Sequence, residues 1–317
     1  MQKIIKEVDQ KRGILQITVA DERWYLKQSR DPETDLPIYK GVPSVTWIAG
    51  YYPKGIGFYK WLAEMGWDEA QAAKQAAGDK GSKVHLAIEM ILNGEEFRVD
   101  TKVLNKSTGQ MEELTFEELL CVKSFCDWRA EAKPEIISTE RVVFSDIHGY
   151  AGRVDLICRI DGVPYVIDFK TSKQIWREHE MQVSAYRVAL ENGENPIHER
   201  NANGTEGKLI DPSGLKTAIL QVGYERNKAG WKFTEIEDNF PLFLVAKQIW
   251  QREAGDQDIK VRDFPIVLSP AAKKEEPAEA IAEAEPMGAA EALPLEESSA
   301  GGVEPPRPKK RAKVTVE

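Results

Sequence analysis

The order of hydrophobic and polar residues predicts a helical stretch followed by a run of strands. Residues 13–27 alternate apolar and polar side chains about Asp21-Glu22, which is typical of a β-hairpin. Beyond Ser44, a residue type that caps helices, the period lengthens to that of helices and later returns to that of strands. The predicted helices cover residues 55–66, 68–77, 81–93, 114–131, 178–191 and 238–254, the predicted strands cover 136–144, 153–160, 164–170, 216–224 and 230–236, and a loop covers 192–214. This pattern predicts an α/β fold with a mixed central sheet flanked by helices.

The last 49 residues differ from the rest in composition. From Ser269 onward the chain holds 7 of its 17 prolines and no aromatic residue. Such a segment buries too little apolar surface to offset the entropy of ordering, so 269–317 is predicted to be disordered. Its basic run, 307–313, is typical of a nuclear-localisation signal, of a nucleic-acid-binding tail or of a solvated end. The predicted organisation is an N-terminal hairpin and lead-in (1–42), one α/β domain (43–268) and this tail.

Charge and cysteine content narrow the class of protein. The 43 Lys+Arg against 52 Asp+Glu leave a net charge of −9, which excludes a protein that coats nucleic acid by bulk positive charge. Contact with a polyanion is therefore expected to be local or assisted by metal. The three cysteines fit neither a disulfide framework nor a paired metal-binding motif, and no apolar run reaches the roughly 18–20 residues that span a bilayer. These features predict a cytoplasmic protein without membrane contact, nuclear only if the basic run is a true localisation signal.

The most informative segment is a predicted hairpin with one carboxylate on each strand. Asp161-Gly162 lies between two β-rich runs, and this dipeptide favours a two-residue turn with positive φ at both positions. Ile160 then pairs with Val163, and the same register places Asp155 opposite Asp168 on one face, with Cβ atoms roughly 4.5–5.5 Å apart. A longer turn would shift this register by one residue and separate the two carboxylates.

Two carboxylates in largely apolar strands need positive charge nearby. Oxygen ligands that face one point suit Mg²⁺ or Mn²⁺, which bind one or two carboxylates together with water and substrate phosphate. Lys170 lies two residues beyond Asp168, so strand alternation places it on the same face. Its ammonium group would orient a water molecule or offset charge on a phosphate. In the alternative interpretation, Asp155 and Asp168 only form salt bridges with Arg153 and Lys170.

Four motifs of the chain, which follow one another in the same order as in the family, resemble those of the PD-(D/E)XK nuclease superfamily. Its defining feature is an acidic residue on one strand and acidic-x-Lys on the next, as in Gly152-Arg153-Val154-Asp155 and Asp168-Phe169-Lys170. Gln182-Val183-Ser184-Ala185-Tyr186 resembles the Gln-x-x-x-Tyr motif of RecB-type nucleases. Gly81-Ser82-Lys83-Val84-His85 resembles the Gly-x-x-x-His of their upstream metal-binding helix. The resemblance covers residues 43–190 and implies a fold like that of restriction endonucleases.

The resemblance implies a metal-dependent catalytic site. His85, Asp155 and Asp168, with the backbone carbonyl of Phe169, would bind Mg²⁺ or Mn²⁺. Lys170 would position the attacking water. The implied reaction is hydrolysis of a phosphodiester bond in DNA, with one or two metal ions.

Residues around that site would bind the substrate. Gln182 and Tyr186, one turn apart on a helix, would line the site and contact DNA. Gly152 would let the backbone approach a phosphate, and Lys173 would add local positive charge. Trp176 follows the same loop and is a candidate for stacking on an unpaired base. The alternative for Gln182 and Tyr186 is a half-buried helix face.

Departures from the family pattern refine the expected activity. Three scattered cysteines do not provide the four that ligate an iron–sulfur cluster in CRISPR-associated exonucleases, so no cluster is expected. The absence of a phosphate-binding Gly-x-x-x-x-Gly-Lys-Ser/Thr motif excludes a fused helicase motor. Glu140 matches a glutamate often found in the family and is given no role. The closest likeness is a stand-alone nuclease of phage or prophage type, which acts as an exonuclease on DNA ends or single strands in replication, recombination or repair.

Two other functions stay open. One is a non-catalytic DNA-binding or recombination-partner protein that retains the nuclease fold. The other is a carboxylate-pair hydrolase that acts on sugars without metal, although it has no use for Lys170. In the nuclease hypothesis, the candidate protein partners are a recombinase, a helicase or a single-strand-binding protein.

Overall fold

The structure is a computed structural model that describes residues 4–19, 22–35, 37–200 and 206–255. The chain divides into two units, Met1–Phe264 and Pro265–Glu317, and all described residues belong to the first. The tail predicted to be disordered, with its basic run, lies outside the described residues. Among the described helices, none has the length and apolar character needed to cross a membrane.

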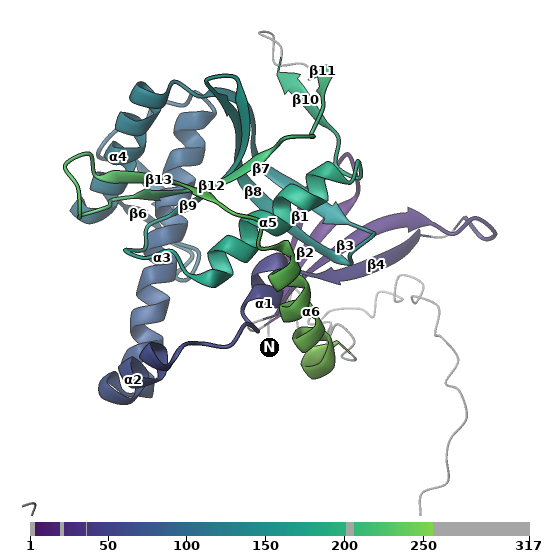
Figure 1. Cartoon of the computed structure of the whole chain (residues 1–317), viewed down its shortest axis with the longest axis horizontal. Coiled ribbons are helices and arrows are strands. Elements are labelled where there is room, and N and C mark those ends of the chain that lie inside the picture. Colours follow the sequence, from purple (N-terminus) through teal and green to yellow (C-terminus); the bar gives the residue numbers. More distant parts are fainter. Residues whose placement is uncertain (1–3, 20–21, 36, 201–205, 256–317) are drawn as a thin grey trace, which may run out of the picture. The chain divides into compact units, whose positions relative to one another are not determined.

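A five-stranded mixed sheet forms the centre of the first unit (Figure 1). Its strands, in spatial order, are β13 (Trp231–Ile236), β12 (Lys216–Val222), β9 (Val163–Lys170), β8 (Tyr150–Ile160) and β7 (Glu135–Ser145). Neighbouring strands are antiparallel except β9 and β12, which are parallel. The parallel pair requires a crossover connection, which contains helix α5 (Arg177–Glu191). The predicted mixed α/β fold is confirmed, with strand ends within a few residues of those predicted.

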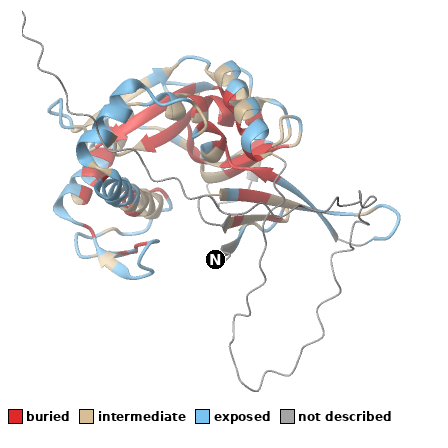
Figure 2. Ribbon diagram, turned by 90° about the horizontal axis from the view of Figure 1, so that it is seen from below, coloured by how far each residue is buried: buried red, intermediate tan, exposed pale blue. Residues whose placement is uncertain are grey.

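Helices cover both faces of this sheet. Helices α1 (Val45–Ala49), α5 and α6 (Phe240–Ala254) pack on one face, and α3 (Trp67–Leu92) and α4 (Phe116–Ala132) pack on the other. Successive residues of a strand point to opposite faces, so β9 contributes Val166 to the first core cluster and Ile167 to the second. Figure 2 shows the buried residues concentrated in the sheet and in the helix surfaces against it.

Helix α3 is longer than predicted. The two helices predicted at 68–77 and 81–93 are one continuous helix, so the predicted break is wrong. Glycine in a helix interior costs only about 1 kcal/mol relative to alanine, and neither Gly78 nor Gly81 ends the helix. The C-terminal half is held by buried Val84, Ala87 and Ile88.

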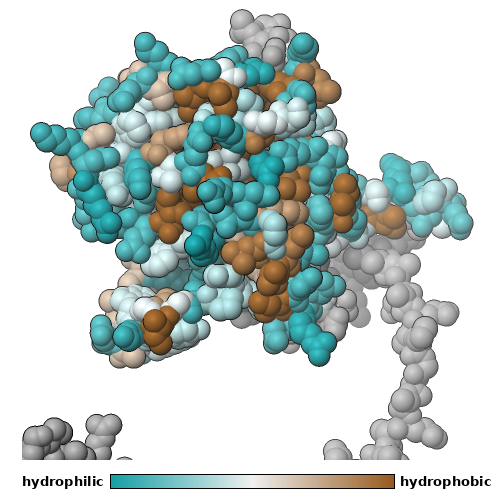
Figure 3. Space-filling view, in the orientation of Figure 1, coloured by the Kyte–Doolittle hydropathy of each residue, from teal (hydrophilic) through white to brown (hydrophobic). Residues whose placement is uncertain are grey.

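Helix α2 (Ile56–Met65) precedes α3 and has no buried residue. It stands at the outer end of α3 in Figure 1, and Figure 3 shows apolar side chains among the polar ones on its surface. The short strands β5 (Lys102–Leu104) and β6 (Met111–Glu113) form a ribbon between α3 and α4. Residues 192–214, predicted as a loop, contain the strands β10 (Ile197–Arg200) and β11 (Glu206–Ile210), so that prediction is wrong in part.

A second sheet precedes the five-stranded sheet along the chain. It contains β1 (Ile4–Asp9), β2 (Ile14–Val19), β3 (Glu22–Arg30) and β4 (Pro37–Pro43), in that order. The predicted hairpin is confirmed as β2 and β3, with Ile17 opposite Trp24. Strands β1 and β4 were not predicted, because neither alternates cleanly and β4 carries a proline at each end. Both lie at the edges of the sheet, where proline is tolerated.

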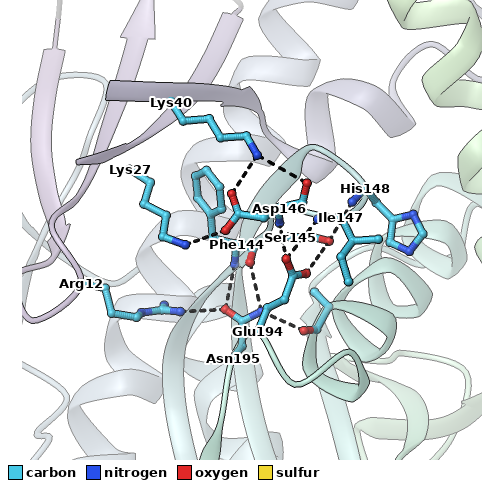
Figure 4. A network of polar contacts seen from close by, with 11 residues as sticks. Arg12, Lys27, Lys40, Phe144, Ser145, Asp146, Ile147, His148, Glu194 and Asn195 are labelled. Carbon is cyan, nitrogen blue, oxygen red and sulfur yellow. Dashed lines mark hydrogen bonds and ion pairs between the residues drawn. The ribbon is translucent and has the colours of Figure 1, made fainter. Parts of the chain in front are cut away.

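A polar network joins this sheet to the end of β7 (Figure 4). The ammonium groups of Lys27 and Lys40 contact the carboxylate of Asp146 at 2.6 and 2.8 Å. The guanidinium of Arg12 donates to the side-chain carbonyl of Asn195 at 2.7 Å. Asn195 is fully buried and also bonds to the backbone of β7 in both directions. We refer to these groups, together with Glu194, as the sheet joint.

Candidate metal centre

Strands β8 and β9 form a tight hairpin, as the sequence predicts. Asp161 and Gly162 have φ values of 50° and 79°, so both turn residues adopt the left-handed conformation. Ile160 pairs with Val163. The two-residue turn and its register are therefore confirmed.

The two strands diverge at their far ends and form a fork. The paired ladder stops at Leu156 and Ile167, one pair before Asp155 and Asp168. The direct pairing predicted for the two aspartates is thus absent from the ladder. Instead, the backbone N–H of Phe169 donates to Asp155 Oδ2 at 2.7 Å, so a side chain replaces the backbone acceptor. Strand β9 stays paired with β12 beyond this point, which leaves the carboxylates in the opening between β8 and β9.

Helix α3 brings His85 to this fork. Its Nε2 lies 3.0 Å from the carbonyl oxygen of Phe169, and its Nδ1 lies 3.6 Å from Asp155 Oδ1. Burial alone would lower the pKa of His85, but the adjacent Asp155 carboxylate raises it above its usual value. The structure therefore brings together His85, Asp155 and the Phe169 carbonyl, three of the four predicted ligands, in a place that favours positive charge.

Glu140 belongs to the same cluster, although the sequence interpretation gave it no role. One ligand atom from each of His85, Glu140 and Asp155 lies within 4.8 Å of the others. Glu140 lies on β7 between two regular pairs of the β7–β8 ladder, in register with Asp155. Its φ of 48° is left-handed, which costs a non-glycine residue about 1–3 kcal/mol. Such strain is concentrated at functional sites, and it aims this carboxylate at the fork.

Each carboxylate of the fork has a basic neighbour, but burial still opposes its ionisation: Arg153 contacts Glu140 at 3.3 Å, His85 Nδ1 lies 3.6 Å from Asp155, and Lys170 is paired with Asp168. Burial and then the charge of Asp155 raise the pKa of Glu140 to about 7. Burial also raises the pKa of Asp168 to about 6, against the opposing effect of Lys170. Burial acts in the same direction on Asp155, but His85, Lys170 and the Phe169 N–H hold its pKa below the usual value. Two carboxyl groups that resist ionisation beside a third that is ionised fit a divalent cation.

A chain of polar contacts leads from Asp168 to helix α5. Lys170 is ion-paired with Asp168 and donates to Gln182 Oε1 at 3.4 Å. Gln182 in turn donates from its amide to the hydroxyl of Tyr186 at 2.9 Å. The ring of Tyr186 is 3% exposed, and a Cβ at Gly152 would lie 2.5 Å from its Cε1. Gly152 makes room for this buried ring, and the contacts of Tyr186 and Gly152 with DNA stay predictions.

The remaining predicted residues lie at the surface. Lys173 is ion-paired with Glu225 at 2.7 Å, and its side chain is 72% exposed. Trp176 precedes α5 and is 53% exposed. Their contacts with DNA stay predictions.

Comparison with protein-family models matches the PD-(D/E)XK nuclease superfamily over residues 58–228. The match begins in α2 and ends after β12, so it covers more than half of the chain. It includes every residue of the fork and of the Lys170–Tyr186 chain, whereas the N-terminal sheet and α6 lie outside it. Comparison with curated proteins gives no match.

Proposed function

Because the chain belongs to the PD-(D/E)XK nuclease superfamily, we propose that it is a divalent-metal-dependent deoxyribonuclease that hydrolyses phosphodiester bonds. Nucleases of this superfamily generally depend on a divalent metal. The observation that carries the proposal is the convergence of His85, Glu140 and Asp155 at the open end of the β8–β9 hairpin. A lysine that contacts the neighbouring acid, Asp168, completes the arrangement.

The donor set fits a hard divalent cation. Carboxylate and carbonyl oxygens outnumber the single imidazole nitrogen, a combination that favours Mg²⁺ or Mn²⁺. In this proposal His85, Asp155, Asp168 and the Phe169 carbonyl hold the metal, and Glu140 joins them. When bound, the metal ion would supply Lewis-acid stabilisation of negative charge on the reacting phosphate.

Lys170 is the residue proposed to act on the attacking water. Its side chain is 17% exposed, so its ammonium group lies at the edge of the buried carboxylates rather than in bulk solvent. Asp168 and Gln182 hold that group from two sides. Gln182 and Tyr186 are thus positioning residues for Lys170. This arrangement orients a water molecule without moving the lysine during the reaction.

The DNA substrate and the cellular process can also be proposed. We propose exonuclease action on DNA ends or single strands during replication, recombination or repair. Lys173 and Trp176 would contact the DNA strand from the surface, since both are exposed beside the site. A recombinase, a helicase or a single-strand-binding protein would deliver such a substrate.

Cleavage assays test the proposal directly. Wild-type protein should degrade 5′- or 3′-labelled DNA with Mg²⁺ or Mn²⁺ and not with EDTA. Asp168→Asn and Lys170→Ala should each lower the rate at least about 10²-fold with an unchanged circular dichroism spectrum. Lys123→Ala, at an exposed position on α4, is the control and should cleave normally.

Two outcomes would contradict the proposal. Undiminished cleavage by Asp168→Asn would remove the fork from the reaction. A wild-type protein that binds DNA but cleaves no substrate with either metal would favour the non-catalytic DNA-binding alternative.

A further inference from the structure

A second polar hollow lies between the N-terminal sheet, helix α1 and helix α3. Its volume is about 500 Å³. Its lining includes two cationic side chains and four hydroxyl groups, from Thr18, Arg23, Ser44, Thr46, Tyr51 and Lys74. No carboxylate is among the residues that line it. We refer to it as the Arg23–Lys74 pocket.

The two cations of this pocket lack acidic partners. Both side chains are exposed, and within the described part of the chain neither forms an ion pair or a side-chain hydrogen bond. Nearby cations differ, because Lys54 contacts Glu178 and Arg153 contacts Glu140 at 3.3 Å. Burial, followed by the positive charge of Lys74, lowers the pKa of Lys54. The pocket thus holds two unpaired cations in a protein of net charge −9, while the acidic influence on its lining is that of Glu22 and Glu253, whose charges act on Tyr51.

The pocket is linked to the metal centre through two elements. Lys74 and His85 lie on α3 and are 11 residues apart, which places them on nearly the same side of the helix and roughly 16 Å apart along its axis. Ser44 forms an isolated parallel bridge with Ala151 of β8, next to Gly152. The charges of Arg23 and Glu140 both act on the buried Tyr25, so the pocket also approaches the cluster from the sheet side.

The chemistry of the lining selects an anion with several acceptor oxygens. A guanidinium, an ammonium and hydroxyl groups are the side chains that contact nucleic-acid phosphates. The absence of lining carboxylates argues against metal ions and basic peptides. A volume of about 500 Å³ also exceeds what a single small ion needs, and leaves room for a sugar next to the phosphate.

We propose that the Arg23–Lys74 pocket binds a phosphate of the DNA strand whose scissile bond lies at the metal centre. The separation of roughly 16 Å along α3 exceeds the distance between neighbouring phosphates of a strand, so the phosphate in the pocket is not a direct neighbour of the reacting one. The proposal rests on the proposed nuclease function for the identity of the strand. It gives an acidic protein a local anchor, which holds DNA upstream or downstream of the reacting phosphate.

Binding and kinetics of pocket variants test this anchor. Arg23→Gln, Lys74→Gln and the double variant are compared with wild type in EDTA, with a fluorescent single-stranded 20-mer and anisotropy as the readout. The double variant should bind at least about tenfold more weakly. The slope of the logarithm of its binding constant against the logarithm of the salt concentration should be smaller in magnitude by about 1. With Mg²⁺, KM should rise and kcat should stay within about twofold. Lys74→Arg should retain affinity, and Lys133→Gln, an exposed charge change at the end of α4, should leave binding and KM unchanged.

The length of the substrate provides a second criterion. A trinucleotide does not span roughly 16 Å plus the active site, so the double variant should cleave it as wild type does. The phosphate in the pocket has two possible sources, a phosphodiester within the strand and a terminal phosphate. In the anisotropy assay with EDTA, equal losses of affinity for circular, 5′-phosphorylated and 5′-hydroxyl DNA indicate the first, and a loss of affinity restricted to 5′-phosphorylated DNA indicates the second.

Separate outcomes would overturn this inference and the nuclease assignment. If wild type cleaves DNA and the double variant matches it in affinity, salt dependence and KM, the pocket is not an anchor. Equal loss of activity on the trinucleotide and the 20-mer would also overturn it. If the wild-type protein cleaves no DNA, but the double variant binds DNA more weakly than wild type, the pocket binds DNA and the nuclease assignment fails.

Discussion

The candidate metal centre and the sheet joint are two polar regions that share strand β7, and their electrostatics are opposite. At the sheet joint, burial would raise the pKa of Asp146, but Lys27 and Lys40 hold it below its usual value. At the metal centre, burial and Asp155 raise the pKa of Glu140 to about 7. The joint therefore supplies enough counter-charge to keep its carboxylate ionised, whereas the basic neighbours of the fork do not offset burial and mutual repulsion at Glu140 and Asp168.

The polar groups of the sheet joint therefore stabilise the fold, whereas the ionised carboxylates of the fork destabilise it. A buried polar group stabilises a protein when its hydrogen bonds are complete, and a buried like-charge cluster destabilises it. The same substitution type, which removes one polar group, should therefore have opposite effects on stability in the two regions.

The largest change in stability is expected at the sheet joint, from Asn195→Ala. The Asn195 amide is saturated, since it accepts from Arg12 and from the Phe144 N–H and donates to the carbonyls of Phe144 and Ala189. Its loss leaves buried backbone groups unpaired, so the free energy of unfolding should fall by about 3–5 kcal/mol in urea titrations. Asn227→Ala, at an exposed position, is the matched control and should cost less than about 1 kcal/mol. Equal losses in the two variants would contradict this account of the joint.

Glu140→Gln should raise the free energy of unfolding, whereas Asn195→Ala lowers it. The raised pKa means that the charged carboxylate destabilises the metal-free protein at neutral pH, so the variant should be about 1–2 kcal/mol more stable there, after allowance for partial exposure. Because the folded-state pKa of Glu140 is raised, its charge costs no stability below the usual pKa of 4.5, and the cost grows as the pH rises through about 7. The difference in stability between the variant and wild type should therefore vanish near pH 4. Thermal unfolding in EDTA measures it.

The same variant should respond less to metal. Saturating Mn²⁺ should stabilise wild type by about 3 kcal/mol at a hundredfold excess over Kd, and the gain should be smaller in Glu140→Gln. If Glu140→Gln destabilises the metal-free protein and retains the full gain, Glu140 is a structural residue outside the metal site.

The smallest effect is expected from Asp146→Asn, because this side chain is 36% exposed and solvent screens its ion pairs. The variant should lose about 1 kcal/mol at neutral pH. A folded-state pKa below the usual 3.8 contributes stability above that value, and the contribution is lost as the pH falls through the lowered pKa. The free energies of unfolding of wild type and variant should therefore converge near pH 2 in denaturant titrations. A difference that does not change with pH would show that the variant acts through the shape of the side chain rather than through its charge.

Local features of the chain explain why much of the fold and the site could be predicted. The turn at Asp161-Gly162 depends on the φ angles of two adjacent residues, so the dipeptide alone indicates the register of β8 and β9. That register places Asp155 and Asp168 at the same end of the hairpin. Lys170 follows from the period of two, and His85 from its place in the family motif.

Contacts between distant segments decided what local patterns did not reveal. Glu140 joins the cluster because the β7–β8 register brings it to Asp155 with a left-handed backbone, and Tyr186 is buried because α5 packs over Gly152. The Arg23–Lys74 pocket likewise combines strand β3 with helix α3.

Short-range order follows from backbone geometry and side-chain periodicity, which are encoded within a few residues. The balance of charge at a buried point is the sum over groups that only the packed chain brings within a few ångströms of one another. The chain therefore specifies by itself which acids and which lysine are available for the chemistry. Tertiary packing determines which of them lie close enough to bind a metal, which ring is buried beneath them, and where unpaired positive charge is left for a phosphate.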